Sequence, residues 1–243
     1  MIRIVVPTVL TEEAYKNSVP YTCLNRIIQT HDSKKMEIYV TIIPENRKGF
    51  CALYNEYIHN DPVENGESIT VFVHDDIEIH DQFFIQKLRK AHERFDIVGV
   101  AGTTSQNYIN ATTLAWHLCM NRKEDGRGFL SHVIPKDIGG YGFPYVNSSF
   151  YGPTPAEVVF VDGVFISFNT KKVADSGVKF NEKYTFHHYD MSACAEAKKV
   201  GLSIGVYPIF AIHHGLGEFH NDKLWQKLAI EFAEDYKDYK QSV

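Results

Sequence analysis

The sequence predicts an α/β fold in which a Rossmann-like mixed sheet is flanked by helices. Short apolar runs rich in Val and Ile alternate with helical segments over the first hundred residues, and this alternation is typical of parallel strands. Several of the runs end abruptly in polar residues or proline. Hydrophobic residues make up 44% of the 243 residues and charged residues 23%, which is ordinary globular usage. Because the chain has no repeat, linker or low-complexity tract, we expect a single domain over residues 1–243.

The expected elements of the first half follow one another in strict alternation. The expected strands cover residues 2–6, 36–43, 68–73 and 96–102, and the expected helices cover about 12–30, 50–58 and 81–95. Each strand is a short β-branched apolar run, and Thr11 and Asp81 are suitable N-caps for the helices that follow them. In parallel sheets ligands bind beyond the carboxyl ends of the strands. Polar residues just past those ends are therefore the first candidates for function.

Residues 103–156 break the alternation. They are rich in glycine and aromatic residues, so we expect a long irregular loop of the kind that forms a lid or a binding loop. Its aromatic side chains, Trp116 among them, either line a binding surface or fill a core beneath the loop. The alternation resumes with a strand region at 157–169, helices before residue 201 and a strand at 202–212. An amphipathic helix is expected over about 221–240.

Composition and charge exclude several classes of protein. The net charge of −5 leaves no basic field for nucleic acid. No run approaches the roughly 20 apolar residues of a membrane-spanning helix. The first residues lack the pattern of a secretory signal, so we expect a cytoplasmic protein. The four cysteines form no CxxC pair, so we expect them to be reduced rather than to bind zinc as a ribbon.

Two adjacent carboxylates follow the third expected strand. Asp75 and Asp76 come directly after the run 68–73, and their mutual repulsion favours a bound cation between or beside them. Oxygen ligands suit Mg²⁺ or Mn²⁺. A turn whose aspartates cap backbone amides would give the same pattern.

Two further groups of chemically active residues end later elements. His213 and His214 follow the strand at 202–212, beside glycines that allow a ligand to approach closely. A neutral imidazole is a good Mn²⁺ ligand, although surface histidines are also common. Asp190 stands at the expected start of a helix, where it is either a plain cap or a carboxylate base kept ionised by the helix dipole.

Taken in order, these segments resemble the GT-A glycosyltransferases, and most closely a bacterial and viral branch of proteins similar to family 2. The resemblance covers about residues 2–217. It is carried by the segments HDD (74–76), VDG (161–163), FHHYD (186–190) and HHGLG (213–217). His74-Asp75-Asp76 resembles the DxD motif of that family, with His74 at a position where Asp is usual.

The resemblance implies a role for each matching residue. Asp76 would bind a Mn²⁺ or Mg²⁺ ion on the donor pyrophosphate, His213 or His214 would be a second ligand, and Asp190 would be the general base on the acceptor hydroxyl. The remaining nucleotide-sugar contacts would come from Pro7, Thr8, Asn46, Lys48, Asn55, His74 and Asp75. Acceptor contacts would come from Trp116, Asp162 and Gly163. Residues 1–102 would then form the nucleotide-binding half, and residues 103–243 the acceptor-binding half.

The activity implied is that of a divalent-metal-dependent, inverting glycosyltransferase of the hexosyltransferase kind, acting in polysaccharide biosynthesis. Its donor would be a UDP-, GDP- or dTDP-sugar and its acceptor a saccharide or glycoconjugate. Two alternatives share the metal carboxylates. One is a metal-dependent nucleotidyltransferase or hydrolase, and the other is a non-catalytic nucleotide-sugar-binding module. Neither alternative requires a base at Asp190.

Overall fold

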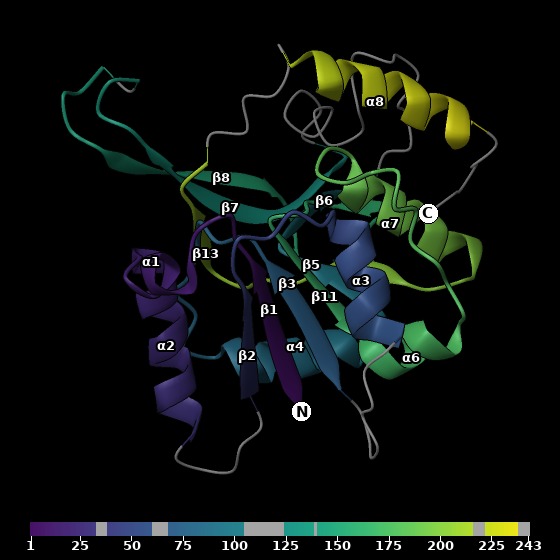
Figure 1. Ribbon diagram of the computed structural model, residues 1–243, viewed down its shortest axis with the longest axis horizontal. Helices are drawn as coiled ribbons and strands as arrows, with labels where there is room; N and C mark the ends of the chain where they lie inside the picture. The colour runs from purple at the N-terminus through teal and green to yellow at the C-terminus, as the bar shows by residue number, and fades with distance from the viewer. Residues whose placement is uncertain (33–37, 60–67, 105–123, 139, 216–221, 238–243) are drawn as a thin grey trace.

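The α/β class is confirmed by a computed structural model of the chain (Figure 1), which describes residues 1–32, 38–59, 68–104, 124–138, 140–215 and 222–237. Where the sequence predicts one mixed sheet, the described strands form two. None of the described helices combines the length and the apolar composition needed to cross a bilayer.

The first sheet contains the strands that the alternating pattern predicts. Its order is β2 (Ile38–Ile43), β1 (Ile2–Pro7), β3 (Ile69–Val73), β11 (Phe165–Asn169), β5 (Ile97–Gly99), β12 (Ile204–Val206) and β9 (Ala156–Glu157). Strand β1 runs parallel to both β2 and β3, so the carboxyl ends of these three strands share one edge. Strand β11 is antiparallel to β3 and β5, which makes the sheet mixed.

Most strands of the second sheet lie next in the chain to strands of the first. Its order is β10 (Phe160–Val161), β6 (Ala101–Thr103), β7 (Gly126–Ile134), β13 (Ala211–His213) and β4 (Ile77–Ile79), and β8 (Tyr145–Gly152) pairs with β7. The chain changes sheet at Val100, at residues 74–76, at residues 162–164 and at residues 207–210. Two of these crossings are the HDD and VDG segments, so both segments lie at the boundary between the sheets.

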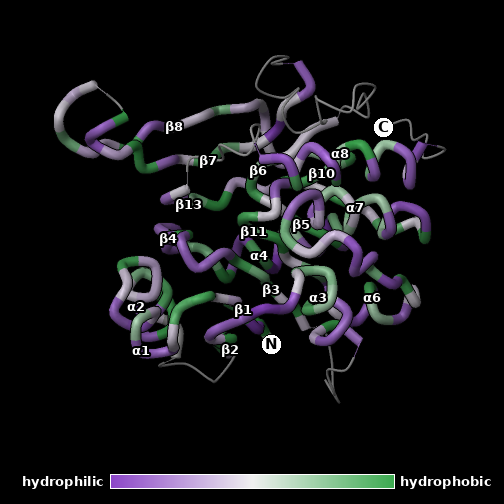
Figure 2. Tube along the Cα trace, turned by 45° about the horizontal axis from the view of Figure 1, so that its top comes forward, coloured by the Kyte–Doolittle hydropathy of each residue, from purple (hydrophilic) through white to green (hydrophobic). Residues whose placement is uncertain are grey.

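Two hydrophobic cores lie on opposite faces of the first sheet. Phe72 of β3 packs into one core, whereas its neighbours Val71 and Val73 pack into the other, as the two-residue period of a strand requires. The first core is covered by α3 (Phe50–His59), α6 (Thr170–Asp175), α7 (Tyr189–Lys199) and α8 (Lys223–Asp235). The second is covered by α1 (Glu12–Lys16), α2 (Val19–Asp32) and α4 (Phe84–His92). Both α2 and α7 carry hydrophobic and hydrophilic stretches, as helices that cover a sheet do (Figure 2).

The expectation of an irregular loop over residues 103–156 is wrong for the second part of that segment. Strands β7 and β8 form a long antiparallel pair there, which extends from the body of the molecule as an arm (Figure 1). On this arm Tyr141, Phe143 and Phe150 are exposed, so they fill no core. The sequence pattern failed because the apolar residues of β8 do not alternate with polar ones and only its last residue, Gly152, is buried. Residues 105–123 lie outside the described part of the chain.

The single helix expected over residues 12–30 is two helices. Helix α1 ends at the cap Asn17, and the hydroxyl of Ser18 then accepts a hydrogen bond from the backbone N–H of Tyr21. This contact satisfies an N–H group in the first turn of α2, so the break costs little free energy.

Gly205 of β12 offers a test of the packing between β12 and the segment after α4. A Cβ added at Gly205 would lie 2.4 Å from the ring of Phe95. We expect Gly205→Ala to lower the free energy of unfolding by about 1–3 kcal/mol in urea titrations, because the ring must move. Adding Phe95→Leu should recover part of that loss, since the shorter side chain vacates the contact; fully additive losses would contradict the proposed clash.

Candidate functional site

A cavity of about 390 Å³ opens at the carboxyl ends of β1 and β3. It is bounded by the HDD segment, the loop before α3 and the segment before α7. The sequence-predicted residues that line it are Pro7, Thr8, Asn46, Lys48, His74, Asp75 and Asp76, and they are joined by Val9, Arg47, Gly49, Phe50, Thr185 and Phe186. The parallel register of β1 and β3 brings these segments together, because the two strands end at the same edge.

Asp75 connects the ends of the two parallel strands. Its carboxylate accepts a hydrogen bond from the hydroxyl of Thr8, which lies just beyond β1. Burial raises the pKa of Asp75, and the hydrogen bond from Thr8 opposes that rise. Thr8 itself is almost fully buried, so the pair is held in place by the surrounding protein.

Asp76 points toward the second sheet and contacts His213. The Nε2 atom of His213 lies 3.3 Å from Oδ2 of Asp76. Burial alone would raise the pKa of Asp76, but the hydrogen bond from His213 and the charge of that ring hold it below its ordinary value. The carboxylate is therefore ionised at neutral pH.

The two consecutive histidines diverge because side chains alternate along a strand. His213 is buried and faces Asp76, whereas the ring of His214 hydrogen-bonds to Glu78 on the other side of the strand. The structure therefore brings His213, and not His214, to the carboxylates of the HDD segment.

His74 completes a group of three potential metal ligands. One ligand atom from each of His74, Asp76 and His213 lies within 4.8 Å of the others. Burial lowers the pKa of His74 to about 4, so its ring is neutral at pH 7 and keeps a lone pair for a metal. The ring also hydrogen-bonds through Nε2 to the hydroxyl of Tyr189 at 2.7 Å.

Two observations show that this group fits a divalent cation. Oδ1 of Asp76 is buried and has no hydrogen-bond partner within the described ranges, which is costly for a carboxylate oxygen. In addition, a Cβ at Gly215 would lie 2.7 Å from the ring of His213 and 3.2 Å from Asp76. Only glycine leaves this space beside the two side chains. A carboxylate with imidazoles is a donor set that suits Mn²⁺.

Asp190 lies in the first turn of α7. Its carboxylate accepts hydrogen bonds from the backbone N–H groups of Met191 at 2.8 Å and Gly163 at 3.0 Å. Burial, reinforced by the charge of Asp162, nevertheless raises the pKa of Asp190 to about 7. The two hydrogen bonds favour the ionised form of Asp190, as the expected position at a helix start does, but burial raises its pKa in spite of them.

Asp162 and Gly163 lie beside Asp190. Oδ1 of Asp162 accepts a hydrogen bond from the N–H of Val164, and burial raises the pKa of Asp162. A Cβ at Gly163 would lie 2.1 Å from the hydroxyl of Tyr189. Since that hydroxyl also holds His74, Gly163 allows the FHHYD and HDD segments to meet.

Asn55 does not face the cavity. Its side chain donates hydrogen bonds to Glu182 and to the carbonyl of Phe180, and it accepts one from the N–H of Phe180. These contacts join α3 to the segment after α6, and Asn55 is not among the residues that line this cavity. The amide of Asn46 is likewise engaged with the backbone of Lys48, where it shapes the loop that lines the cavity.

Sequence reasoning missed several side chains at the site. Phe50 stacks on Tyr189 with ring centroids 4.3 Å apart, and the half-exposed Phe186 stacks near His74. His132 of β7 lies directly opposite His213 of β13. The polar run at residues 45–49, which includes Arg47, marks this loop in the sequence. The aromatic residues of the site cannot be distinguished from core residues by sequence alone. Trp116 lies outside the described residues.

Comparison with known proteins gives a match to a family model and matches to solved structures. Residues 5–243 match the model of a family described as "Glycosyltransferase like family". No curated protein matches the chain. A solved structure that it resembles is protein A197 from STIV, with 11% sequence identity, a TM-score of 0.44, and coverage of 85% of this chain and 81% of that one.

The Thr8–Asp75 hydrogen bond can be tested with a pair of substitutions of similar size. Thr8→Val removes the donor and leaves the buried Asp75 carboxylate with one contact fewer, so we expect a loss of about 1.5–3 kcal/mol in unfolding free energy. Thr8→Ser keeps the hydroxyl and should cost less. A larger loss for Thr8→Ser than for Thr8→Val in urea unfolding at pH 7 would show that the methyl group, rather than the hydrogen bond, supports the site.

Proposed function

The chain belongs to a glycosyltransferase-like family, and on this premise we propose that it transfers a sugar from a nucleoside-diphosphate sugar to an acceptor hydroxyl with inversion. The observation that supports this best is the placement of two groups at one sheet boundary. The ligand group of His74, Asp76 and His213 adjoins the cavity, and Asp190 follows Tyr189, whose hydroxyl contacts His74.

The cavity has the chemistry that a nucleotide requires. We place the donor diphosphate beside Arg47 and Lys48, whose positive charges suit phosphate oxygens. Lys48 also pairs with Glu56 at 2.6 Å, so that contact has to loosen when phosphate binds. We place the base of the nucleotide against the half-exposed ring of Phe186, which lines the cavity. In this proposal residues 1–102 supply most of the nucleotide contacts, and a UDP-, GDP- or dTDP-hexose is the donor.

A divalent cation, Mn²⁺ or Mg²⁺, would be held by Asp76 and His213, with His74 as a further ligand. When bound, such an ion acts as a Lewis acid toward the leaving diphosphate. The neutral state of His74 and the ionised state of Asp76 are the states that ligands need.

Asp190 is the proposed general base. A pKa of about 7 is close to the value at which a carboxylate both removes protons effectively and is substantially ionised at neutral pH. The backbone N–H groups of Gly163 and Met191 fix its orientation. A single base opposite the leaving group favours direct displacement, and the acceptor, a saccharide or glycoconjugate, would lie along Asp162 and Gly163.

The proposed reaction is tested by incubating the protein with UDP-, GDP- and dTDP-sugars and Mn²⁺. A glycosyltransferase releases nucleoside diphosphate, slowly to water and faster to an acceptor. Release of nucleoside monophosphate would indicate a nucleotidyltransferase or hydrolase instead. Nucleotide binding with no turnover on any donor would indicate a binding module.

The metal ligands can be separated by comparing adjacent histidines. We expect His213→Ala to weaken Mn²⁺ binding in the presence of nucleotide at least about ten-fold, because a direct ligand is lost. His214→Ala removes an equal side chain on the opposite face and should have a smaller effect. Electron paramagnetic resonance of free Mn²⁺ measures both, and the reverse order, or full turnover in excess EDTA, would refute the assignment.

The role of Asp190 predicts a pH profile. The base acts in its ionised form, so the rate of sugar transfer should increase as the pH rises through the pKa of Asp190, near 7. Below that pH Asp190 is protonated and the rate should be low. Asp190→Asn should lower transfer by roughly 10²–10⁴-fold and abolish this rise, while Mn²⁺ and nucleotide affinities change little. Loss of donor binding in Asp190→Asn would instead place Asp190 in the donor site.

A further inference from the structure

A second group of metal-ligating side chains lies on the opposite side of β4 from the cavity. The Sγ atom of Cys23 is 3.7 Å from Oε2 of Glu78 and 3.7 Å from Nε2 of His80. The same Glu78 oxygen is 2.6 Å from Nε2 of His80. One ligand atom from each of the three residues lies within 4.8 Å of the others.

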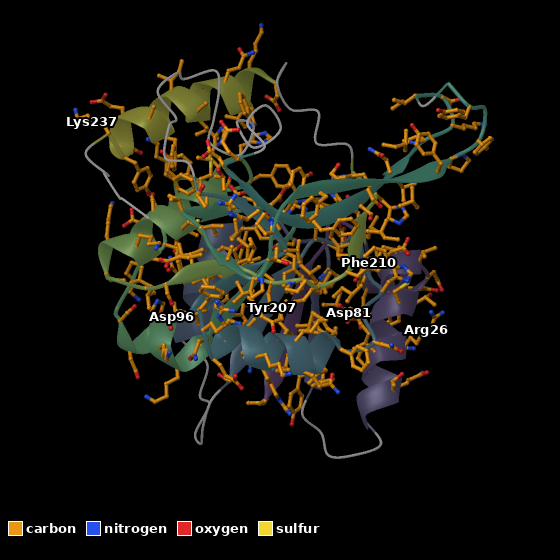
Figure 3. All side chains as sticks on the ribbon, turned by 180° about the vertical axis from the view of Figure 1, so that it is seen from behind. Arg26, Asp81, Asp96, Tyr207, Phe210 and Lys237 are labelled. Carbon is orange, nitrogen blue, oxygen red and sulfur yellow. The ribbon has the colours of Figure 1, made fainter. Side chains whose placement is uncertain are left out.

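The fold brings these residues together from two elements. Glu78 of β4 and His80, two residues later, lie on the same face of the strand, and this face meets α2, which carries Cys23. Seen from behind, Asp81 and Phe210 lie on the same side of the molecule as Arg26 of α2 (Figure 3). Cys23 and Glu78 are buried, whereas His80 is partly exposed, so the group has a closed end and an open end.

We propose that Cys23, Glu78 and His80 bind a zinc-class transition metal ion at a site separate from the proposed donor site. Zinc bonds of about 2.3 Å to sulfur and 2.0–2.1 Å to nitrogen or oxygen place tetrahedral sulfur and nitrogen ligands about 3.6 Å apart. The two sulfur distances, both 3.7 Å, are close to this value. The shorter separation between Glu78 and His80 widens when the ion replaces their hydrogen bond.

The ligand set determines which ion binds. A cysteine sulfur with imidazole and carboxylate selects zinc over Mg²⁺ or Mn²⁺, which prefer oxygen-rich sites. His214 hydrogen-bonds to the second oxygen of Glu78 and so orients the carboxylate, as second-layer partners of metal ligands commonly do. The fourth position faces solvent on the side of His80.

The bound ion would link elements that support the candidate active site. The ion would join α2 to β4, and His214 would continue the link to the end of β13, where His213 faces Asp76. An occupied site therefore stabilises the segment that positions His213, and its effect is measurable without any activity assay.

Co²⁺ titration of the full chain tests the proposal, because cobalt bound to thiolate gives a near-ultraviolet charge-transfer band. We expect one equivalent of Co²⁺ to develop this band, zinc to displace it, and Cys23→Ser to abolish it. Cys51→Ser is the matched control, since Cys51 is also buried but its Sγ contacts only the backbone oxygen of Tyr189 among the contacts shown. That variant should keep the band.

Two further variants keep the result interpretable. His80→Ala changes a partly exposed residue and should lower the cobalt affinity at least about ten-fold while the protein stays folded by circular dichroism. His213→Ala removes a ligand of the other site and should leave the band intact, which separates this proposal from the proposed donor site. Absence of the band, or a band that survives Cys23→Ser or disappears in His213→Ala, would overturn the proposal.

Discussion

Two adjacent carboxylates at a buried strand end constrain the rest of the candidate site. Asp75 and Asp76 lie where the chain leaves the first sheet for the second, and both are partly buried. Ionised carboxylates in such a place need partners of opposite charge or hydrogen-bond donors. Thr8 supplies the donor for Asp75 and His213 supplies the partner for Asp76, so the two neighbours are directed to different parts of the molecule.

The boundary between the sheets places the other chemical groups around this pair. The segment at 162–164 crosses the same boundary, and within it the backbone N–H of Gly163 donates a hydrogen bond to the carboxylate of Asp190. Tyr189 connects that side to His74, and the absence of a side chain at Gly163 makes the contact sterically possible. The surroundings of the three titratable groups give them different protonation behaviour: burial keeps His74 neutral, His213 keeps Asp76 ionised, and burial raises the pKa of Asp190 to about 7. The separate roles that we propose for the ligand group and for the base follow from environment rather than from residue type.

Strand alternation also explains why two histidines in sequence belong to two clusters. His213 faces the candidate donor site, and His214 faces Glu78 in the group that includes Cys23. The strand β13 therefore lies between two sets of metal-ligating side chains. Any event that reorders β4 or β13 affects both sets, because Glu78 and Asp76 are separated by a single residue on the same short segment.

The sequence by itself determined the α/β class, most of the strands of the first sheet, and the segments that carry the polar site residues. It could do so because buried strands need apolar runs, and the polar residues that follow those runs mark the carboxyl ends at which ligands bind in such sheets. It did not determine the division into two sheets or the β7–β8 arm, because short strands such as β4 and β10 and the exposed strand β8 leave little periodic signal. Only the tertiary structure decided that His213 rather than His214 meets Asp76, that Asn55 holds backbone instead of facing the cavity, and that Asp190 has a pKa near 7. Each of these depends on strand register, on a long-range hydrogen bond or on burial, and none of the three is encoded by residue type at a single position.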